Sequence, residues 1–197
     1  MRTDKFRLLI EHGDSVGVKN ALASVPALAN ESDPLHYVSD CVGNGWLANE
    51  TASEITELLL SHGAALDGTQ GRESPLTAAV SLGAARVARV LIESGAELEA
   101  TSIFGARALH WAAWMGMKSS VALLITHGAS IEPKCTEFGA TPLFWAVHGY
   151  GPNGPKVKYD QVGPAQLLIE SPDTTPHTSK FITAKAFFSI NSRRGST

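Results

Sequence analysis

This sequence of 197 residues has few cysteines, no large excess of charge and no long apolar run. Its two cysteines, Cys41 and Cys135, cannot supply the dense disulfide framework of a small secreted domain. A net charge of −3 gives no bulk attraction to nucleic acid or to an anionic membrane. No apolar run approaches the ~18 residues of a membrane-spanning helix, and the first residues lack the apolar core of a secretory signal. We therefore expect a cytoplasmic protein that binds neither nucleic acid nor membrane.

What the sequence does have is a repeated pattern of two short helices. Four helix starts read alike: Pro34-Leu35-His36, Ser74-Pro75-Leu76-Thr77, Arg107-Ala108-Leu109-His110 and Thr141-Pro142-Leu143-Phe144. Each is followed by an apolar second helix, marked by the pairs Leu58-Leu59, Val90-Leu91, Leu123-Leu124 and Leu167-Leu168. Pro75, Ala108 and Pro142 are spaced by 33 and 34 residues. This spacing predicts an array of similar helical hairpins.

A period near 33 residues with a Thr-Pro-Leu-His type of helix start resembles the ankyrin repeat. The resemblance covers residues 5–172 and is strongest at 107–116 and 141–147; the inserts described next make it similar to a subgroup of bacterial ankyrin proteins. It implies an all-α solenoid of about four repeats, with a helical amino-terminal cap at residues 5–30. We assign residues 1–172 to this domain and 173–197 to an irregular tail. Thr77 and Phe144 depart from the pattern, because histidine usually stands there.

The two end repeats are longer than the two central ones. From the start of the first helix to the aliphatic pair of the second takes 15 residues in repeats two and three, 24 in repeat one and 25 in repeat four. The extra residues fall at 41–49 and 150–159, and the second stretch is rich in glycine and proline, which predicts a loop. Inserts in repeat proteins often lie on the binding face.

Seven histidines raise the question of a metal site. Five of them fall at repeated positions: His36 and His110 at helix starts, and His12, His62 and His127 just before a helix-ending glycine. The pattern predicts structural or surface roles for these five, with no metal and no other cofactor. A nucleophilic pair of Cys41 and His36 lacks a third orienting group and an oxyanion hole, so no enzyme is predicted.

The ankyrin resemblance also implies which side chains face the concave groove of the array. In repeats three and four these positions are rich in aromatic residues and methionine: Phe104, Trp114, Met115 and Phe138. His148 is the histidine with the best prospect of touching a ligand, and Tyr150 begins the loop of repeat four. Trp111 and Trp145 are predicted to lie in the core. Exposed aromatic side chains of this kind favour recognition of a partner.

We therefore predict a monomeric, non-enzymatic recognition module that binds a protein partner in the groove and at the hairpin tips of repeats three and four. Two alternatives stay open. One is a small-ligand or enzyme-associated role, with an aromatic pocket beneath the repeat-four loop. The other is a structural fragment whose aromatic side chains pack beneath that loop or the tail. The surroundings of Trp114 distinguish them, because an open groove suits a protein and an enclosed polar pocket suits a small ligand.

Overall fold

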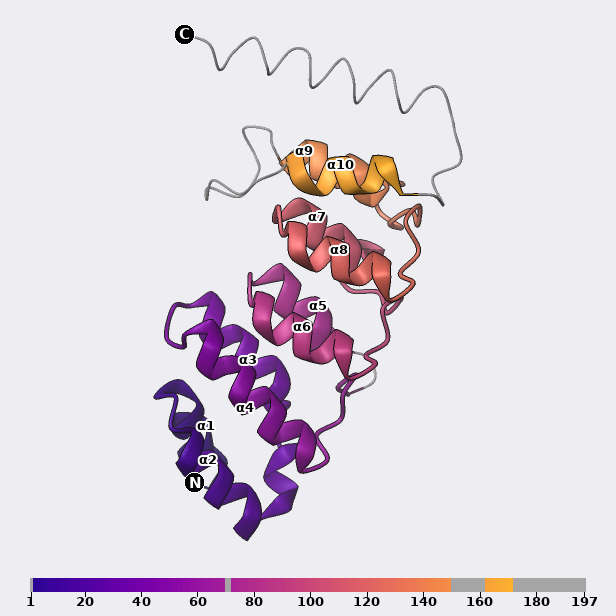
Figure 1. Cartoon of the computed structure of the whole chain (residues 1–197). Coiled ribbons are helices and arrows are strands. Elements are labelled where there is room, and N and C mark those ends of the chain that lie inside the picture. Colours follow the sequence, from indigo (N-terminus) through magenta and orange to yellow (C-terminus); the bar gives the residue numbers. More distant parts are fainter. Residues whose placement is uncertain (1, 70–71, 150–161, 172–197) are drawn as a thin grey trace, which may run out of the picture.

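A computed structural model describes residues 2–69, 72–149 and 162–171. These residues form ten α-helices and two short 3₁₀ helices, and within them no β-strand is found beyond one isolated bridge between Thr101 and Arg107. The helices follow one another in pairs that stack along the molecule (Figure 1). The chain is therefore an all-α protein, as the sequence predicts. None of the helices so described is long and apolar enough to cross a membrane.

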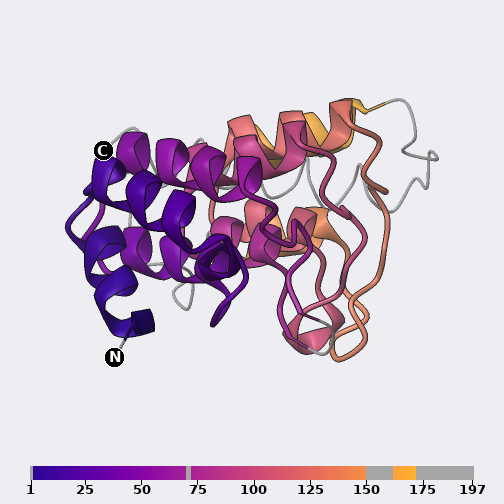
Figure 2. The same ribbon diagram turned by 90° about the horizontal axis from the view of Figure 1, so that it is seen from below.

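Each pair contributes one helix to each of two layers, which Figure 2 shows as two rows. The first layer contains α1 (Arg2–Glu11), α3 (Pro34–Gly43), α5 (Pro75–Ser81), α7 (Ala108–Trp114) and α9 (Pro142–Gly149). The second contains α2 (Ser15–Ser24), α4 (Asn49–Ser61), α6 (Ala85–Glu93), α8 (Lys118–Thr126) and α10 (Val162–Glu170). The 3₁₀ helices are η1 (Pro26–Ala29) and η2 (Ile103–Gly105). Connections between successive pairs leave the layers on one side of the molecule.

The helix starts follow from proline and from capping hydroxyl groups. Pro75 stands at the first position of α5, where a missing N–H leaves no helical bond unmade. The Ser74 hydroxyl accepts a hydrogen bond from the Thr77 amide at 3.2 Å. The Thr141 hydroxyl accepts one from the Phe144 amide at 3.4 Å. Each of these hydroxyl groups therefore satisfies an amide that the helix itself cannot.

The second helices end where a glycine takes the left-handed conformation. Gly63, Gly95 and Gly128 have φ values of 84°, 88° and 89°, a region that other residues rarely adopt. The histidine before two of these glycines donates from Nδ1 to the carbonyl four residues earlier, at 2.8 Å for His62 and 2.9 Å for His127. His12 does the same at the end of α1. These three histidines therefore close helix ends, which confirms their predicted structural role.

The extra residues at 41–49 lengthen helices more than they form a loop. Helix α3 has ten residues against seven in α5, and α4 has thirteen against nine in α6. The connection at 44–48 is only two residues longer than the one at 82–84. Cys41, in α3, is fully buried, which favours the longer helix, and Leu47 is buried within the short connection.

One continuous apolar core runs between the two layers. Its fully buried aliphatic side chains include Ile10, Leu22, Ile55, Leu59, Leu76, Leu91, Leu109, Leu124 and Leu168. A second, smaller cluster of buried residues lies beside α7 and α9 and consists of Ala106, Cys135, Ala140 and Trp145. The predicted loop at 150–159, with Tyr150, and the tail at 173–197 lie outside the described residues.

Candidate functional site

An apolar cleft of about 530 Å³ lies where α7 and α9 meet the segments that precede them. Its lining consists of Phe104, Trp111, Trp114, Phe138, Ala140, Phe144, Trp145 and His148, and we call it the aromatic cleft. Six of these eight residues are phenylalanine or tryptophan. Of the six residues that the sequence proposed for partner binding, four line it: Phe104, Trp114, Phe138 and His148.

Helical spacing brings the side chains of α7 and α9 to one face. Trp111 and Trp114 are three residues apart in α7, and Phe144 and His148 are four apart in α9, so each pair shares a face of its helix. The rings of Phe144 and His148 stack with centroids 5.7 Å apart and planes at 19°. Because α7 and α9 lie side by side, the two pairs together form a single aromatic wall.

Trp145 is the centre of this wall. Its ring meets those of Trp111 and Trp114 edge to face, with centroids 5.1 and 5.8 Å apart and planes at 80° and 70°. Such perpendicular contacts are a favoured arrangement of aromatic rings. Trp145 is 7% exposed, which agrees with its predicted core position. Trp111 was also predicted to be core, but it stays half-buried and lines the cleft, where its indole N–H donates to the Ser102 hydroxyl at 2.9 Å.

Phe104 reaches the cleft from a strained turn. It adopts a φ of 64°, a left-handed conformation that is unusual for a bulky residue and carries strain of about 1 kcal/mol or more. Its carbonyl accepts hydrogen bonds from the Glu137 amide at 3.2 Å and the Thr136 hydroxyl at 3.1 Å. A Cβ at the following Gly105 would collide with Thr136. This close approach holds the Phe104 ring 5.4 Å from that of Phe138.

His110, in α7, binds the backbone of Ala140, which lines the cleft. Its ring is fully buried, and Nδ1 accepts a hydrogen bond from the Arg107 amide at 3.1 Å. Nε2 lies 3.1 Å from the carbonyl of Ala140, to which it donates. Burial lowers the pKa of His110, so the neutral ring that this pair of bonds requires is favoured. The predicted structural role of His110 is therefore confirmed, and it links α7 to the segment that precedes α9.

Two residues differ from the sequence prediction: Met115, which was expected at the site, and Phe144, which was not. Met115 is half-buried, packs against the main core and is not among the residues that line the cleft. Phe144 lines the cleft and is 58% exposed, although the sequence pattern gave no functional role to it. The available signal was its spacing of four residues from His148, but the resemblance assigned this position to a structural histidine.

A second cavity, of about 390 Å³, lies between α1, α3 and the segment before α5. We call it the charged cavity because its lining includes Arg7, Asp33, His36, Asp40, Arg72 and Glu73. The His36 ring lies 3.3 Å from Asp40 and 3.9 Å from Glu73. Interaction with Glu73, together with the charge of Asp40, raises the pKa of His36 against the opposing effect of burial. His36 therefore belongs to a cluster of ion pairs, whereas the equivalent His110 forms buried hydrogen bonds to backbone groups.

The raised pKa of His36 predicts a pH-dependent contribution to stability. A histidine with a raised folded-state pKa stabilises the fold below its unfolded value, about 6.5, and this contribution is lost as the pH rises through the folded value. We expect His36→Asn to reduce the free energy of unfolding more at about pH 5.5 than at about pH 8. Urea denaturation of both proteins at the two pH values measures this. If His36→Asn reduces the free energy of unfolding equally at the two pH values, or more at the higher one, the raised pKa of His36 is contradicted.

The cysteines offer no reactive thiol. Both are buried, and burial raises the pKa of Cys41 to about 11, which keeps its thiol protonated near neutral pH. Both ring nitrogens of His36 face carboxylates, those of Asp40 and Glu73, and not the thiol of Cys41. Within the ranges that the structure describes, no group of three or more histidine, cysteine, aspartate or glutamate residues could hold a metal ion.

The sequence was also compared with models of known protein families, and no family model matches it. The function is therefore inferred from the geometry of the aromatic cleft and from the repeated helix pattern.

Proposed function

We propose that the chain is an ankyrin-repeat solenoid of about four repeats and that its function is the non-enzymatic recognition of a protein partner in the aromatic cleft. The solenoid assignment is supported by equivalent residues in successive helix pairs. Trp111 and Trp145 are both the fourth residue of their helices, and Gly95 and Gly128 end successive second helices with nearly equal φ values. Each helix pair packs on its neighbours in both layers, as stacked repeats do.

The observation that carries the recognition function is a group of exposed aromatic rings held in a fixed arrangement. Phe138 and Phe144 are 60% and 58% exposed, and Phe104 is 37% exposed, yet each has a ring partner in the cleft. Large exposed apolar groups that lie together mark interaction sites in soluble proteins. Rings that are already ordered lose little conformational entropy on binding, so more of the contact energy appears as affinity.

The lining favours a protein segment over a small polar ligand. Small-ligand sites combine an apolar enclosure with several convergent polar groups. Among the described residues that line the aromatic cleft, His148 is the single titratable one. An apolar or aromatic side chain from a partner would fill such a cleft without requiring polar contacts. A small aromatic ligand is a second candidate, because about 530 Å³ falls within the usual range of ligand pockets.

A displayed library of random peptides tests the proposal, with affinities of the recovered peptides measured by isothermal titration calorimetry. We expect Trp114→Ala to weaken peptide binding by ~2 kcal/mol, roughly thirtyfold, because tryptophan is a common binding hot spot. Trp114→Ala also removes ring contacts with Trp145 and so is expected to lower stability by about 1 kcal/mol. Binding is therefore measured well below the melting transition, and Phe144→Ala serves as a second cleft variant.

Trp46→Ala provides the matched control, since Trp46 is 58% exposed in the connection between α3 and α4, outside the cleft. We expect it to bind the peptides like the wild type. If the recovered peptides bind Trp114→Ala and Phe144→Ala as tightly as they bind the wild type, a role for the cleft is contradicted. Cleft-dependent binding of small aromatic compounds, with no peptide recovered, would favour the second candidate.

A further inference from the structure

The aromatic cleft and the charged cavity lie along one row of equivalent helix positions. Asp40, Ser81, Trp114 and His148 are each the seventh residue of α3, α5, α7 and α9. These four helices lie side by side in order within the first layer (Figure 1). Equivalent positions on aligned helices face the same way. The row therefore leads from the charged cavity at Asp40, across Ser81, to the aromatic cleft at Trp114.

The charged cavity contributes negative charge to its end of the row. Asp33 is paired with Arg72, and the carboxylate of Glu11 accepts a hydrogen bond from the hydroxyl of Tyr37. Asp40 and Glu73 differ, because both contact the one ring of His36, which carries at most a single positive charge. Their side chains are 39% and 28% exposed, so a further cation can approach them.

The guanidinium of Arg7 lies over the Tyr37 ring, 4.6 Å from the ring centroid, and the hydroxyl of the same tyrosine donates to Glu11. The negative charge of Glu11 therefore offsets that of Arg7 and leaves the two carboxylates beside His36 opposed by that ring alone among the described residues. One end of the row is thus acidic and the other is apolar, with the small neutral side chain of Ser81 between them. A ligand that matched both ends would carry a basic group and an apolar group at a fixed separation.

The separation follows from helix packing. Adjacent packed helices lie roughly 8–10 Å apart, so α3 and α7, with α5 between them, are about 16–20 Å apart. An extended chain advances about 3.3 Å per residue, so it spans this distance in about five or six residues. We infer that the partner is an extended peptide segment with an aromatic or aliphatic anchor in the aromatic cleft and an arginine or lysine about five or six residues away, at Asp40 and Glu73. This inference rests on the proposed function.

The experiment uses fluorescein-labelled synthetic peptides that contain one Trp and one Arg, separated by two to ten Ser and Thr residues, in both orders. A matched set carries Gln in place of Arg. Fluorescence anisotropy with the full chain at low salt gives the affinities. We expect the Arg peptide to bind roughly fivefold more tightly than its Gln counterpart, with the largest difference at a separation of about five or six residues. Added salt is expected to reduce this difference, since it screens exposed charges.

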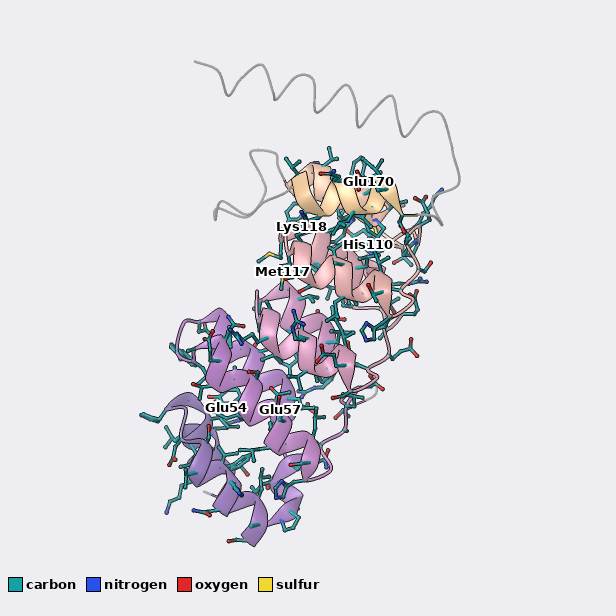
Figure 3. All side chains as sticks on the ribbon, in the orientation of Figure 1. Glu54, Glu57, His110, Met117, Lys118 and Glu170 are labelled. Atoms are coloured by element: carbon teal, nitrogen blue, oxygen red, sulfur yellow. The ribbon has the colours of Figure 1, made fainter. Side chains whose placement is uncertain are left out.

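The double variant Asp40→Asn, Glu73→Gln is expected to abolish the preference for Arg while retaining the binding of the Gln peptide. The control Glu54→Gln, Glu57→Gln changes the total charge equally, but both residues lie on α4 in the second layer, as Figure 3 shows, and the preference should persist. Trp114→Ala is expected to weaken the Arg and Gln peptides alike.

The outcomes separate this inference from the proposed function. Equal affinity for the Arg and Gln peptides, or a preference that survives Asp40→Asn, Glu73→Gln, overturns the inference, while binding that depends on Trp114 still supports the cleft. Binding by no peptide, or binding that Trp114→Ala leaves unchanged, overturns both.

Discussion

Replacing His110 with alanine is expected to lower the free energy of unfolding by about 3–5 kcal/mol. The ring is fully buried and bonds to the Arg107 amide and the Ala140 carbonyl. Its removal leaves the Arg107 amide without its partner, at about 1–3 kcal/mol, and takes from the Ala140 carbonyl one of its two hydrogen bonds, the other coming from the Cys135 amide. It also leaves a cavity beside Trp145. Urea denaturation followed by circular dichroism at pH 7 measures the change.

His127→Ala is the matched control, because its ring is exposed and bonds a helix-end carbonyl that water can also reach. We expect it to lose less than about 1 kcal/mol. A His110→Ala protein as stable as His127→Ala would contradict the buried bridge.

The pH dependence gives a second readout for His110. Its folded-state pKa is lowered, so the unfolded chain binds the proton first as the pH falls below about 6.5. The wild type should therefore lose this part of its stability on acidification, and His110→Ala should not. The effect is opposite in sign to that of His36, so variants at the two positions separate them.

Leu91→Ala and Leu124→Ala should each lower the free energy of unfolding by ~2–5 kcal/mol. Both side chains are fully buried in the core between the layers, in α6 and α8, and truncation leaves a cavity that neighbouring helices cannot fill. Leu8→Ala is the control, because Leu8 is 50% exposed in α1 and should change stability by less than about 1 kcal/mol. Wild-type denaturation midpoints in both core variants would show that these helices are assigned to the wrong face.

Much of the fold could be predicted because its signals are local. The hydroxyl caps at Ser74 and Thr141 and the left-handed glycines at Gly95 and Gly128 each depend on a few neighbouring residues. The first insert was harder to interpret. Whether its residues form a loop or extend α3 and α4 depends on which of them find buried positions, and that is decided by packing against other helices. The full burial of Cys41, near the end of α3, is an example.

The candidate site could be predicted only in part, because the sequence indicates which positions share a surface but not how side chains from different helices pack. The resemblance indicated that Phe104, Trp114, Met115 and Phe138 would share a surface and that His148 could touch a ligand; all of these but Met115 line one cleft. Ring packing between α7 and α9 could not be deduced from the pattern. Trp145 stands edge to face against Trp111 and leaves that ring half-buried, a result of contacts between helices more than 30 residues apart in sequence.

The central claim, that the aromatic cleft binds a partner segment, is tested most directly by the indole N–H signals of the four tryptophans in a ¹H–¹⁵N spectrum. Three of these residues, Trp111, Trp114 and Trp145, line the cleft, and Trp46 lies outside it. Titration with a peptide selected from the random library should shift the three cleft signals and leave that of Trp46 unchanged. Saturable binding that shifts Trp46 alone, or none of the four, would contradict the claim.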